Sequence, residues 1–332
     1  LIIFQHGQKW ELALENMLYK DKVIYSAHTQ YQHITVTQRI IDPTKTPIYS
    51  LFINGRTQFS SSDEAIYHEM LVHPAMAASG KHKNILIIGG GDGLAAREVL
   101  KWNPETVTLV DLDPAVINFF SKEQFDETRG IIINAPLLKL NQNALTDPRL
   151  HIIIGDAFNK INDLLKKQLL YDTIIVDLPD PSHPDLNKLY SDRFYQKLSL
   201  LLSGDGAMVI QSTSPYHAKK AFISIGKTVK AAGLRHVEQY HTNVPSFGDW
   251  GWTIATKNGK SPLNRLKTRD TTPFNDLAMR WLTKELAIAA FQFPKTFFSK
   301  QQFVKINTLG SHILYNYHQQ AWQKEQDSYS LP

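Results

Sequence analysis

Alternating apolar and polar residues mark the first structured region of the chain. Between residues 23 and 59, segments such as Ile34-Thr-Val36-Thr-Gln38 alternate with a period of two, which is typical of half-buried strands. Asn54-Gly55 follows an apolar stretch at 48–53 and predicts a tight two-residue hairpin. We therefore expect a leader segment at 1–22 and a small antiparallel β domain at 23–62.

The pattern changes after residue 63. Asp63 is placed to cap a helix over residues 64–78, whose apolar positions have helical spacing. From residue 83, short apolar segments alternate with helical ones, which predicts a doubly wound, parallel α/β sheet over residues 63–262. The strands are expected at 85–88, 107–110, 151–154, 173–176, 207–211, 234–241 and near 252–255.

Residues 263–332 form an expected C-terminal helical extension. Apolar residues at 277–282 and 287–291 predict two helices that pack on the outside of the sheet. Of the 332 residues, 42% are apolar, which suffices for one large core or two ordinary ones. No segment reaches the roughly 18 consecutive apolar residues that span a bilayer.

Composition excludes several kinds of site. The chain has no cysteine, so disulfides and thiolate metal sites are impossible. The net charge is +5, but Lys and Arg are scattered, which favours a basic, solvated surface over a nucleic-acid site. No zinc-finger or RNA-binding signature is present, and we expect no nucleic-acid partner.

A glycine-rich loop is the first candidate binding site. Gly89-Gly90-Gly91-Asp92-Gly93 links an apolar strand to a helix that begins near Leu94. Glycines there allow a ligand to approach the helix N-terminus closely, although a purely structural turn is the alternative. A carboxylate at Asp92 would repel the pyrophosphate of a dinucleotide, so the loop favours a cationic ligand.

Two further acidic residues follow neighbouring strands. Asp111 ends the next strand, where a carboxylate can bind ribose hydroxyls; its alternative role is to cap the helix that follows Pro114. Asp156 follows the strand at 151–154 and could accept a hydrogen bond from an adenine amino group, or equally cap the next helix.

An acidic tract follows the strand at 173–176. Residues 171–187 contain four acidic residues and no Lys or Arg, a local reversal in a basic chain. Ligands of open α/β sheets bind at the carboxyl ends of strands, so Asp177 and Asp180 should face the same crevice as the glycine loop. The alternative is a proline-rich turn with solvated carboxylates.

Together these motifs resemble the spermidine synthase (polyamine aminopropyltransferase) family over about residues 31–255. The resemblance is carried by the order and spacing of Asp63-Glu-x-x-Tyr67-His-Glu-Met70, Gly89-Gly-Gly-Asp-Gly93, Asp111-Leu-Asp113, Gly155-Asp156 and Asp177-x-x-Asp180-Pro. It implies a Rossmann-like, methyltransferase-type fold and transfer of an aminopropyl group from decarboxylated S-adenosylmethionine to putrescine or a related amine. That co-substrate is the only cofactor expected, and the resemblance implies no metal.

The resemblance also implies roles for individual residues. It identifies Asp177 as the catalytic aspartate that orients and deprotonates the attacking amine. The expected donor-binding residues are Gln32, Gly89, Gly91, Asp92, Gly93, Asp111, Asp156 and Ala157. The expected acceptor-binding residues are Tyr67, His68, Asp180, Gln211 and Phe247. Without the resemblance, a helical histidine such as His68 is more often a packing or hydrogen-bonding residue than a base.

Two departures concern the amine acceptor. Animal spermidine synthases have a glutamate for the far amine of putrescine, whereas the matching residue here is the uncharged Thr213. Phe247 replaces the more usual tyrosine. Asp249 or Asp185 could supply the missing anion. The alternative functions are a methyltransferase that uses intact S-adenosylmethionine, and a non-catalytic polyamine- or nucleoside-binding domain.

The flanking segments at 17–25 and 281–322 resemble a bacterial subgroup whose catalytic domain follows a multi-helix membrane region. The apolar residues Leu1 to Phe4 agree with such a preceding region. We therefore expect a cytoplasmic enzyme, held at the inner membrane through an N-terminal region. The family resemblance also implies a homodimer or a higher homo-oligomer.

Overall fold

The computed structural model describes residues 17–269, 274 and 276–329, and contains two main β-sheets. The smaller sheet is antiparallel, with β1 (Lys22–His28), β2 (His33–Arg39), β3 (Ile48–Ile53) and β4 (Arg56–Ser60) in that order. Asn54 and Gly55 connect β3 and β4 with φ of 50° and 75°, as a tight hairpin turn requires. The predicted hairpin and N-terminal sheet are confirmed, whereas Leu1 to Phe4 lie outside the described residues.

The larger sheet has seven strands in the order β12-β13-β11-β10-β5-β6-β9. Its strands are β5 (Asn84–Gly89), β6 (Thr106–Asp111), β9 (Leu150–Ile154), β10 (Tyr171–Asp177), β11 (Leu202–Gln211), β12 (His236–Val244) and β13 (Gly248–Thr256). Five strands are parallel, while β13 runs antiparallel to both β11 and β12. The predicted Rossmann-like, doubly wound sheet is confirmed, although β12 begins and ends later than the predicted 234–241.

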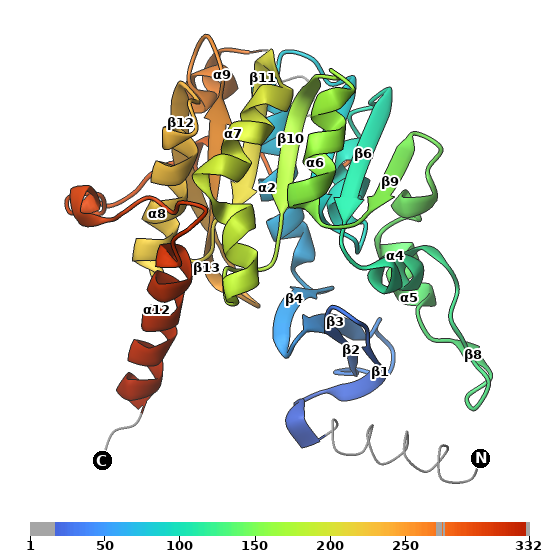
Figure 1. The fold of residues 1–332 in the computed structure, drawn as a ribbon. Helices are drawn as coiled ribbons and strands as arrows, with labels where there is room; N and C mark the ends of the chain where they lie inside the picture. Colours follow the sequence, from blue (N-terminus) through green and yellow to red (C-terminus); the bar gives the residue numbers. More distant parts are fainter. Residues whose placement is uncertain (1–16, 270–273, 275, 330–332) are drawn as a thin grey trace.

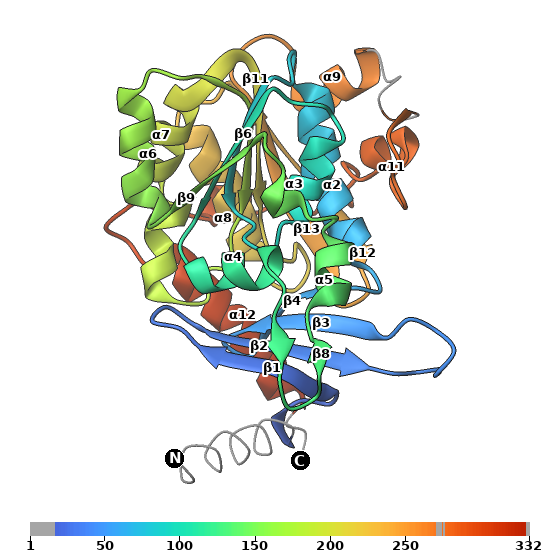
Figure 2. The same cartoon turned by 90° about the vertical axis from the view of Figure 1, so that its right-hand side faces the viewer.

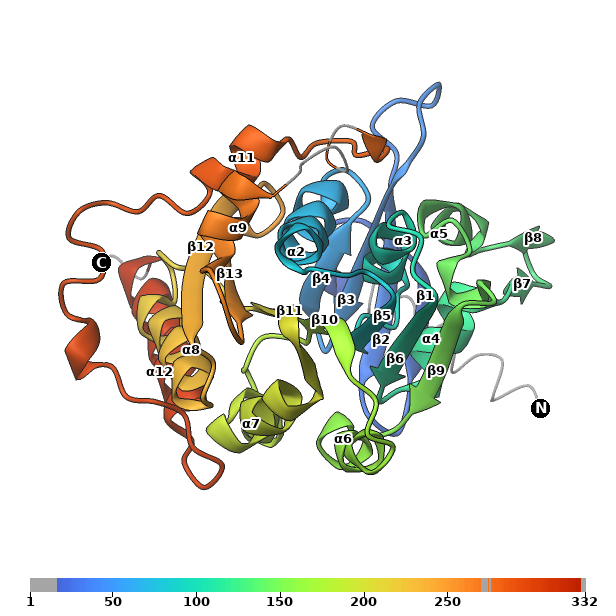
Figure 3. The ribbon, with the colours of Figure 1, turned by 90° about the horizontal axis from the view of Figure 1, so that it is seen from above.

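Helices cover both faces of this sheet (Figures 2 and 3). One face packs on α2 (Glu64–Ala78), α3 (Leu94–Leu100) and α9 (Pro262–Thr268). The other packs on α6 (Ala157–Lys166), α7 (Asp192–Leu201), α8 (Lys219–Ala231) and, outside α8, α12 (Ile313–Tyr329). Alternate residues of β5 point to opposite faces, so Ile85 and Ile87 join the first core and Leu86 and Ile88 the second.

The short elements between β6 and β9 lie on the side of the large sheet that faces the N-terminal strands (Figure 1). They are α4 (Pro114–Ser121), β7 (Phe125–Asp126), β8 (Ile131–Ile132), α5 (Ala135–Leu140) and the 3₁₀ turn η1 (Ala144–Thr146). Figure 1 shows the sheet β1–β4 below the large sheet, on the side of α4. No helix among the described residues is long and apolar enough to cross a membrane.

Two local predictions were wrong. Asp63 precedes α2 but does not cap it, because its carboxylate accepts hydrogen bonds from the backbone N–H (2.6 Å) and hydroxyl (2.9 Å) of Ser246. Residues 277–282 are not helical. Their backbone instead turns around the buried Glu69 carboxylate, which accepts from the N–H groups of Arg280, Trp281 and Leu282 at 2.6, 2.9 and 2.7 Å.

The second predicted C-terminal helix is present but starts earlier. Helix α11 (Lys284–Ala289) covers only the first part of the predicted 287–291, because Thr283 caps its N-terminus by accepting from the backbone N–H of Leu286. Two 3₁₀ turns, η2 (Pro184–Tyr190) and η3 (Gln301–Phe303), complete the fold.

Candidate functional site

The glycine loop is shaped by contacts that leave no room for side chains. Gly89, Gly90 and Gly93 have φ of 81°, 71° and 79°, a region that glycine tolerates best. A Cβ atom on Gly89 would lie 2.1 Å from the carbonyl oxygen of Asp177, and one on Gly91 would lie 2.8 Å from Oδ2 of Asp111. The loop is therefore packed directly against two of the predicted site residues.

Asp92 lies inside this loop with partial access to solvent. Its Oδ1 accepts a hydrogen bond from the backbone N–H of Leu94 (2.9 Å) at the start of α3. Burial raises the pKa of Asp92 to about 6; the neighbouring Asp177 carboxylate raises it as well, while His68 opposes the rise. A ligand cation placed here would favour the ionised carboxylate, in line with the cationic ligand that the loop sequence predicts.

Asp111 and Asp113, at the end of β6, have different hydrogen-bonding roles. Asp113 caps α4 by accepting from the backbone N–H of Ala115 (2.9 Å), so Asp111 is not the helix cap. Oδ1 of Asp111 accepts from the backbone N–H of Asp113 (2.9 Å), and burial raises the pKa of Asp111. The Asp111 carboxylate is held beside the glycine loop, where the ribose contact remains a prediction.

Gln32 and Asp156 are both engaged by protein groups. The Gln32 side-chain amide donates to Oδ2 of Asp113 (2.9 Å), and the Thr29 hydroxyl donates to the same oxygen (2.7 Å). These bonds join the N-terminal sheet to α4. Asp156 caps α6, whose first residue is Ala157, and also forms an ion pair with Lys188. The capping role of Asp156 is thus real, and an adenine contact would have to share its carboxylate.

Asp177 ends β10 opposite Gly89 of β5. Its Oδ1 accepts a 2.7 Å hydrogen bond from the hydroxyl of Tyr67, which comes from α2. Burial raises the pKa of Asp177, whereas His68 and the Tyr67 hydrogen bond act in the opposite direction. Burial also raises the pKa of Tyr67 well above its ordinary value, so this hydroxyl remains a donor. A carboxylate with a raised pKa is a suitable proton acceptor.

Asp180 lies in a polar cluster formed by β11 and the loop after β10. The Gln211 amide donates to Oδ1 of Asp180 (3.1 Å) and the Thr213 hydroxyl donates to Oδ2 (3.4 Å). The indole N–H of Trp250 donates to Oε1 of Gln211 (3.2 Å), which fixes the orientation of the amide. Asp177 and Asp180 therefore present two carboxylates from one loop.

Phe247, one of the expected acceptor-binding residues, lies between two other aromatic side chains. Its ring lies 5.8 Å from that of Tyr67 and 5.1 Å from that of Trp250. The two candidates for the missing anion are not in this cluster. Asp249 pairs with His241 (2.7 Å), and the side chain of Asp185 is 90% exposed beside His183.

Sequence reasoning missed a buried charge network behind the site. His68 Nδ1 bonds to the backbone carbonyl of Glu64 (2.8 Å) and to its carboxylate (3.0 Å), and Arg97 also binds that carboxylate (2.9 Å). Burial alone would lower the pKa of His68, but Glu64 reverses this and raises it. Asp92 and Asp177 lie near enough to His68 to add to this rise. The helical i, i+4 spacing of Glu64 and His68 was the available signal.

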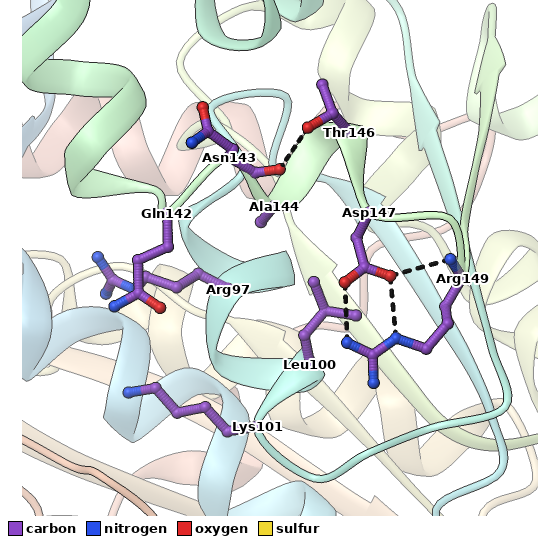
Figure 4. A pocket seen from close by; sticks show the side chains of 9 residues that line it. All are labelled: Arg97, Leu100, Lys101, Gln142, Asn143, Ala144, Thr146, Asp147 and Arg149. Atoms are coloured by element: carbon purple, nitrogen blue, oxygen red, sulfur yellow. Dashed lines mark hydrogen bonds and ion pairs between the residues drawn. The ribbon is translucent and has the colours of Figure 1, made fainter.

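A separate cavity of about 340 Å³ lies at the far end of α3 from the glycine loop (Figure 4). Three cations line it, but each is already paired: Arg97 with Glu64, Lys101 with Glu98, and Arg149 with Asp147. It therefore offers no free charge to a ligand. Within the described part of the chain, no group of three or more His, Asp or Glu residues could hold a metal ion.

The arrangement suits a reaction between two cations. One end presents Asp92 and Asp111 beside a glycine loop, and the other presents Asp177 and Asp180 beside an aromatic wall. At the second end, the raised pKa of Asp177 suits its carboxylate to take a proton from a bound amine.

Comparison with known proteins agrees with this chemistry. Residues 64–268 match the spermine/spermidine synthase domain. The chain is 53% identical to a polyamine aminopropyltransferase of Shewanella oneidensis over 98% of this chain and 56% of that protein. It is 41% identical to polyamine aminopropyltransferase 1 of Streptomyces coelicolor over 94% of this chain and 54% of that protein. The chain spans little more than half the length of these relatives.

Solved structures share the fold. A spermidine synthase from Thermotoga maritima is 25% identical, with a TM-score of 0.68 over 85% of this chain and 87% of that chain. A spermidine synthase in complex with the transition state analogue AdoDATO is 26% identical, with a TM-score of 0.71 over 84% of this chain and 88% of that chain.

Proposed function

Because the chain belongs to the spermine/spermidine synthase family, we propose that it transfers the aminopropyl group of decarboxylated S-adenosylmethionine to putrescine or a related amine. The observation that carries this proposal is the Asp177 carboxylate, held by Tyr67 beside the glycine loop that contains Asp92. A proton acceptor in this position would be near both substrates of such a transfer.

The reaction is a displacement at carbon. The acceptor amine has an ordinary pKa of about 10 and arrives protonated, so it must first lose a proton. Asp177 accepts this proton, and the free nitrogen lone pair attacks the methylene carbon bound to the sulfonium. A C–N bond forms as the C–S bond breaks, and its electron pair neutralises sulfur to give methylthioadenosine. Alignment of the two substrates supplies much of the acceleration.

The donor end has groups for both the ammonium and the nucleoside of the donor. The donor has an ammonium and a sulfonium but no carboxylate, so the ionised Asp92 can bind the ammonium without repelling the rest of the ligand. Asp111 is held against Gly91 and can accept from ribose hydroxyls. Asp156 would share its carboxylate between the α6 cap, Lys188 and the adenine edge, with Ala157 beside it, and Gln32 would act through its hydrogen bond to Asp113.

The acceptor end is formed by Tyr67, Asp180, Gln211 and Phe247, with His68 behind Tyr67. Since Asp249 and Asp185 lie elsewhere, Asp180 is the candidate anion for a second ammonium. We infer that the acceptor is a short diamine.

The deciding experiment compares two donors. The protein is mixed with putrescine and either decarboxylated or intact S-adenosylmethionine, and the nucleoside product is identified. We expect methylthioadenosine with the decarboxylated donor. S-adenosylhomocysteine as the sole product would instead indicate a methyltransferase, and binding without any product would indicate a polyamine- or nucleoside-binding domain.

We further propose that the full-length protein is a homo-oligomer on the cytoplasmic face of the inner membrane. The support is the resemblance of residues 17–25 and 281–322 to the membrane-associated bacterial subgroup. Fractionation of cells that express the full-length protein should recover it with the membranes, and its detergent-solubilised mass should correspond to at least two copies.

A further inference from the structure

The C-terminal helix α12 brings a histidine to the acceptor end of the site. The helix packs on α8 and η2, and His318 on it is fully buried. Its Nε2 lies 3.3 Å from Oδ2 of Asp180, which is 138 positions earlier in the chain. Figure 1 shows α12 beside α8, running down past the large sheet toward the level of the N-terminal strands. The expected outer extension thus contributes a side chain to the site.

The proton of His318 can be placed from its neighbours. Nδ1 is buried without a hydrogen-bond partner among the described residues, whereas Nε2 faces the Asp180 carboxylate and lies 3.2 Å from the indole N–H of Trp322, which can only donate. A proton on Nδ1 would be a buried donor with no acceptor. A proton on Nε2 donates to a carboxylate, which is the stronger kind of hydrogen bond, and it displaces only the indole N–H of Trp322, a partly exposed side chain that can donate to water instead.

This donor completes the set that fixes Asp180. Gln211 holds Oδ1, while Thr213 and His318 both reach Oδ2, the latter two from elements far apart in the sequence. The contacts from Thr213 and His318 have similar lengths, 3.4 and 3.3 Å, so the two side chains hold this oxygen together. The carboxylate can still accept a bond from an ammonium, because Oδ1 accepts only from Gln211 among the described residues and keeps a second lone pair.

The helix is also anchored through Trp322. The ring of Trp322 lies 4.3 Å from that of His217, and Arg56 of β4 lies 5.9 Å from the same indole. Helix α12 therefore contacts the N-terminal sheet as well as the loop that contains Asp180. Both contacts restrict where His318 can lie.

We propose that His318 is a positioning residue of the acceptor site, which orients the Asp180 carboxylate toward the far ammonium of a diamine. The inference rests on the proposed aminopropyl transfer and extends it, because it makes helix α12 part of the site that binds the acceptor amine.

Steady-state kinetics with putrescine test this role in the full-length protein. Changing His318→Leu should raise the KM for putrescine about tenfold, the loss expected when one charge-assisted hydrogen bond is removed. The kcat at saturating putrescine, the KM for the donor and the midpoint of thermal unfolding should stay unchanged. His318→Gln, whose amide can donate from a similar position, should restore most of the affinity. His312→Leu, an exposed histidine just before α12, is the matched control.

The outcomes separate the two proposals. A parent enzyme that forms no methylthioadenosine would overturn the proposed function and this inference with it. An active parent and an unchanged KM in His318→Leu would overturn only the role of His318. A lower unfolding midpoint in His318→Leu that His318→Gln does not correct, with equal losses of donor and acceptor affinity, would show that His318 only supports the fold.

Discussion

The hydroxyl of Tyr67 donates a 2.7 Å hydrogen bond to Oδ1 of Asp177, and so ties helix α2 to the end of strand β10. The bond favours the ionised carboxylate, while burial of Asp177 favours the protonated one and prevails. The pair therefore combines a fixed orientation with a raised pKa, the two properties required of a general base.

Asp177→Asn should remove this base. We expect kcat to fall by about 10²- to 10⁴-fold with little change in donor affinity, because the amide keeps the shape but takes no proton. Stability at neutral pH should be unchanged or higher, since the ionised carboxylate is unfavourable in the fold. Asp185→Asn, at an exposed position of the next turn, is the control. Full activity of Asp177→Asn in a methylthioadenosine assay would refute the mechanism.

Tyr67→Phe should change the pH dependence of turnover. In the native enzyme, the hydrogen bond from Tyr67 lowers the pKa of Asp177. Removing the hydroxyl therefore lets that pKa rise further. The acidic limb of the kcat profile should therefore move to higher pH. An unshifted limb with reduced kcat would mean that Tyr67 acts on the amine and not on Asp177.

Donor affinity should depend on pH through Asp92. Its pKa of about 6 lies above the ordinary 3.8, so the ionised form that binds an ammonium is lost as the pH falls below about 6. We expect calorimetry to show weaker binding of the decarboxylated donor at pH 5 than at pH 7.5. Methylthioadenosine, which lacks the ammonium, should show a smaller change. Equal changes for both ligands would place the titrating group at the nucleoside.

The raised pKa of Asp92 also predicts how the stability of the unliganded protein changes with pH. Because the folded pKa of Asp92 exceeds the unfolded value, its contribution to stability is complete below about pH 3.8 and is lost as the pH rises through about 6. Asp92→Asn should therefore stabilise the unliganded protein more at pH 7.5 than at pH 5. Denaturant unfolding at the two pH values measures this difference, and an equal effect at both would contradict the assigned pKa.

Gly89→Ala tests the close packing of the loop. The left-handed φ alone costs about 1–2 kcal/mol for a residue other than glycine. The added Cβ would also lie 2.1 Å from the Asp177 carbonyl, so the loss should exceed that range and displace Asp177. Gly55→Ala has a similar φ of 75° and no atom within 4 Å, so it should show only the strain and keep full activity. Similar unfolding free energies for the two variants would exclude the steric effect.

Much of this site follows from the sequence because its residues stand at strand ends. Parallel strands bring their carboxyl ends to one edge, so Asp92, Asp111 and Asp177 could be grouped from strand order alone. The small sheet was predictable for a similar reason, since its strands are consecutive and Asn54-Gly55 sets one turn.

The remaining features depend on contacts that leave no local pattern. Residues 277–282 read as helical, yet their N–H groups bind Glu69 more than 200 positions away, which overrides the local preference. Likewise, His318 meets Asp180 only because α12 folds back over η2. A single histidine in a helical pattern carries no sign of its partner.

Because β13 lies between β11 and β12 in the sheet, the strands must pair in a particular order while the protein is being synthesised. As the chain leaves the ribosome, β11 can join β10 once residue 211 has emerged, but its other edge stays unpaired until residues 248–256 follow. During that interval the nascent chain presents an open row of backbone donors and acceptors, which invites pairing between neighbouring chains. A nascent chain halted within this window should thus be the species most prone to aggregation and most in need of a chaperone.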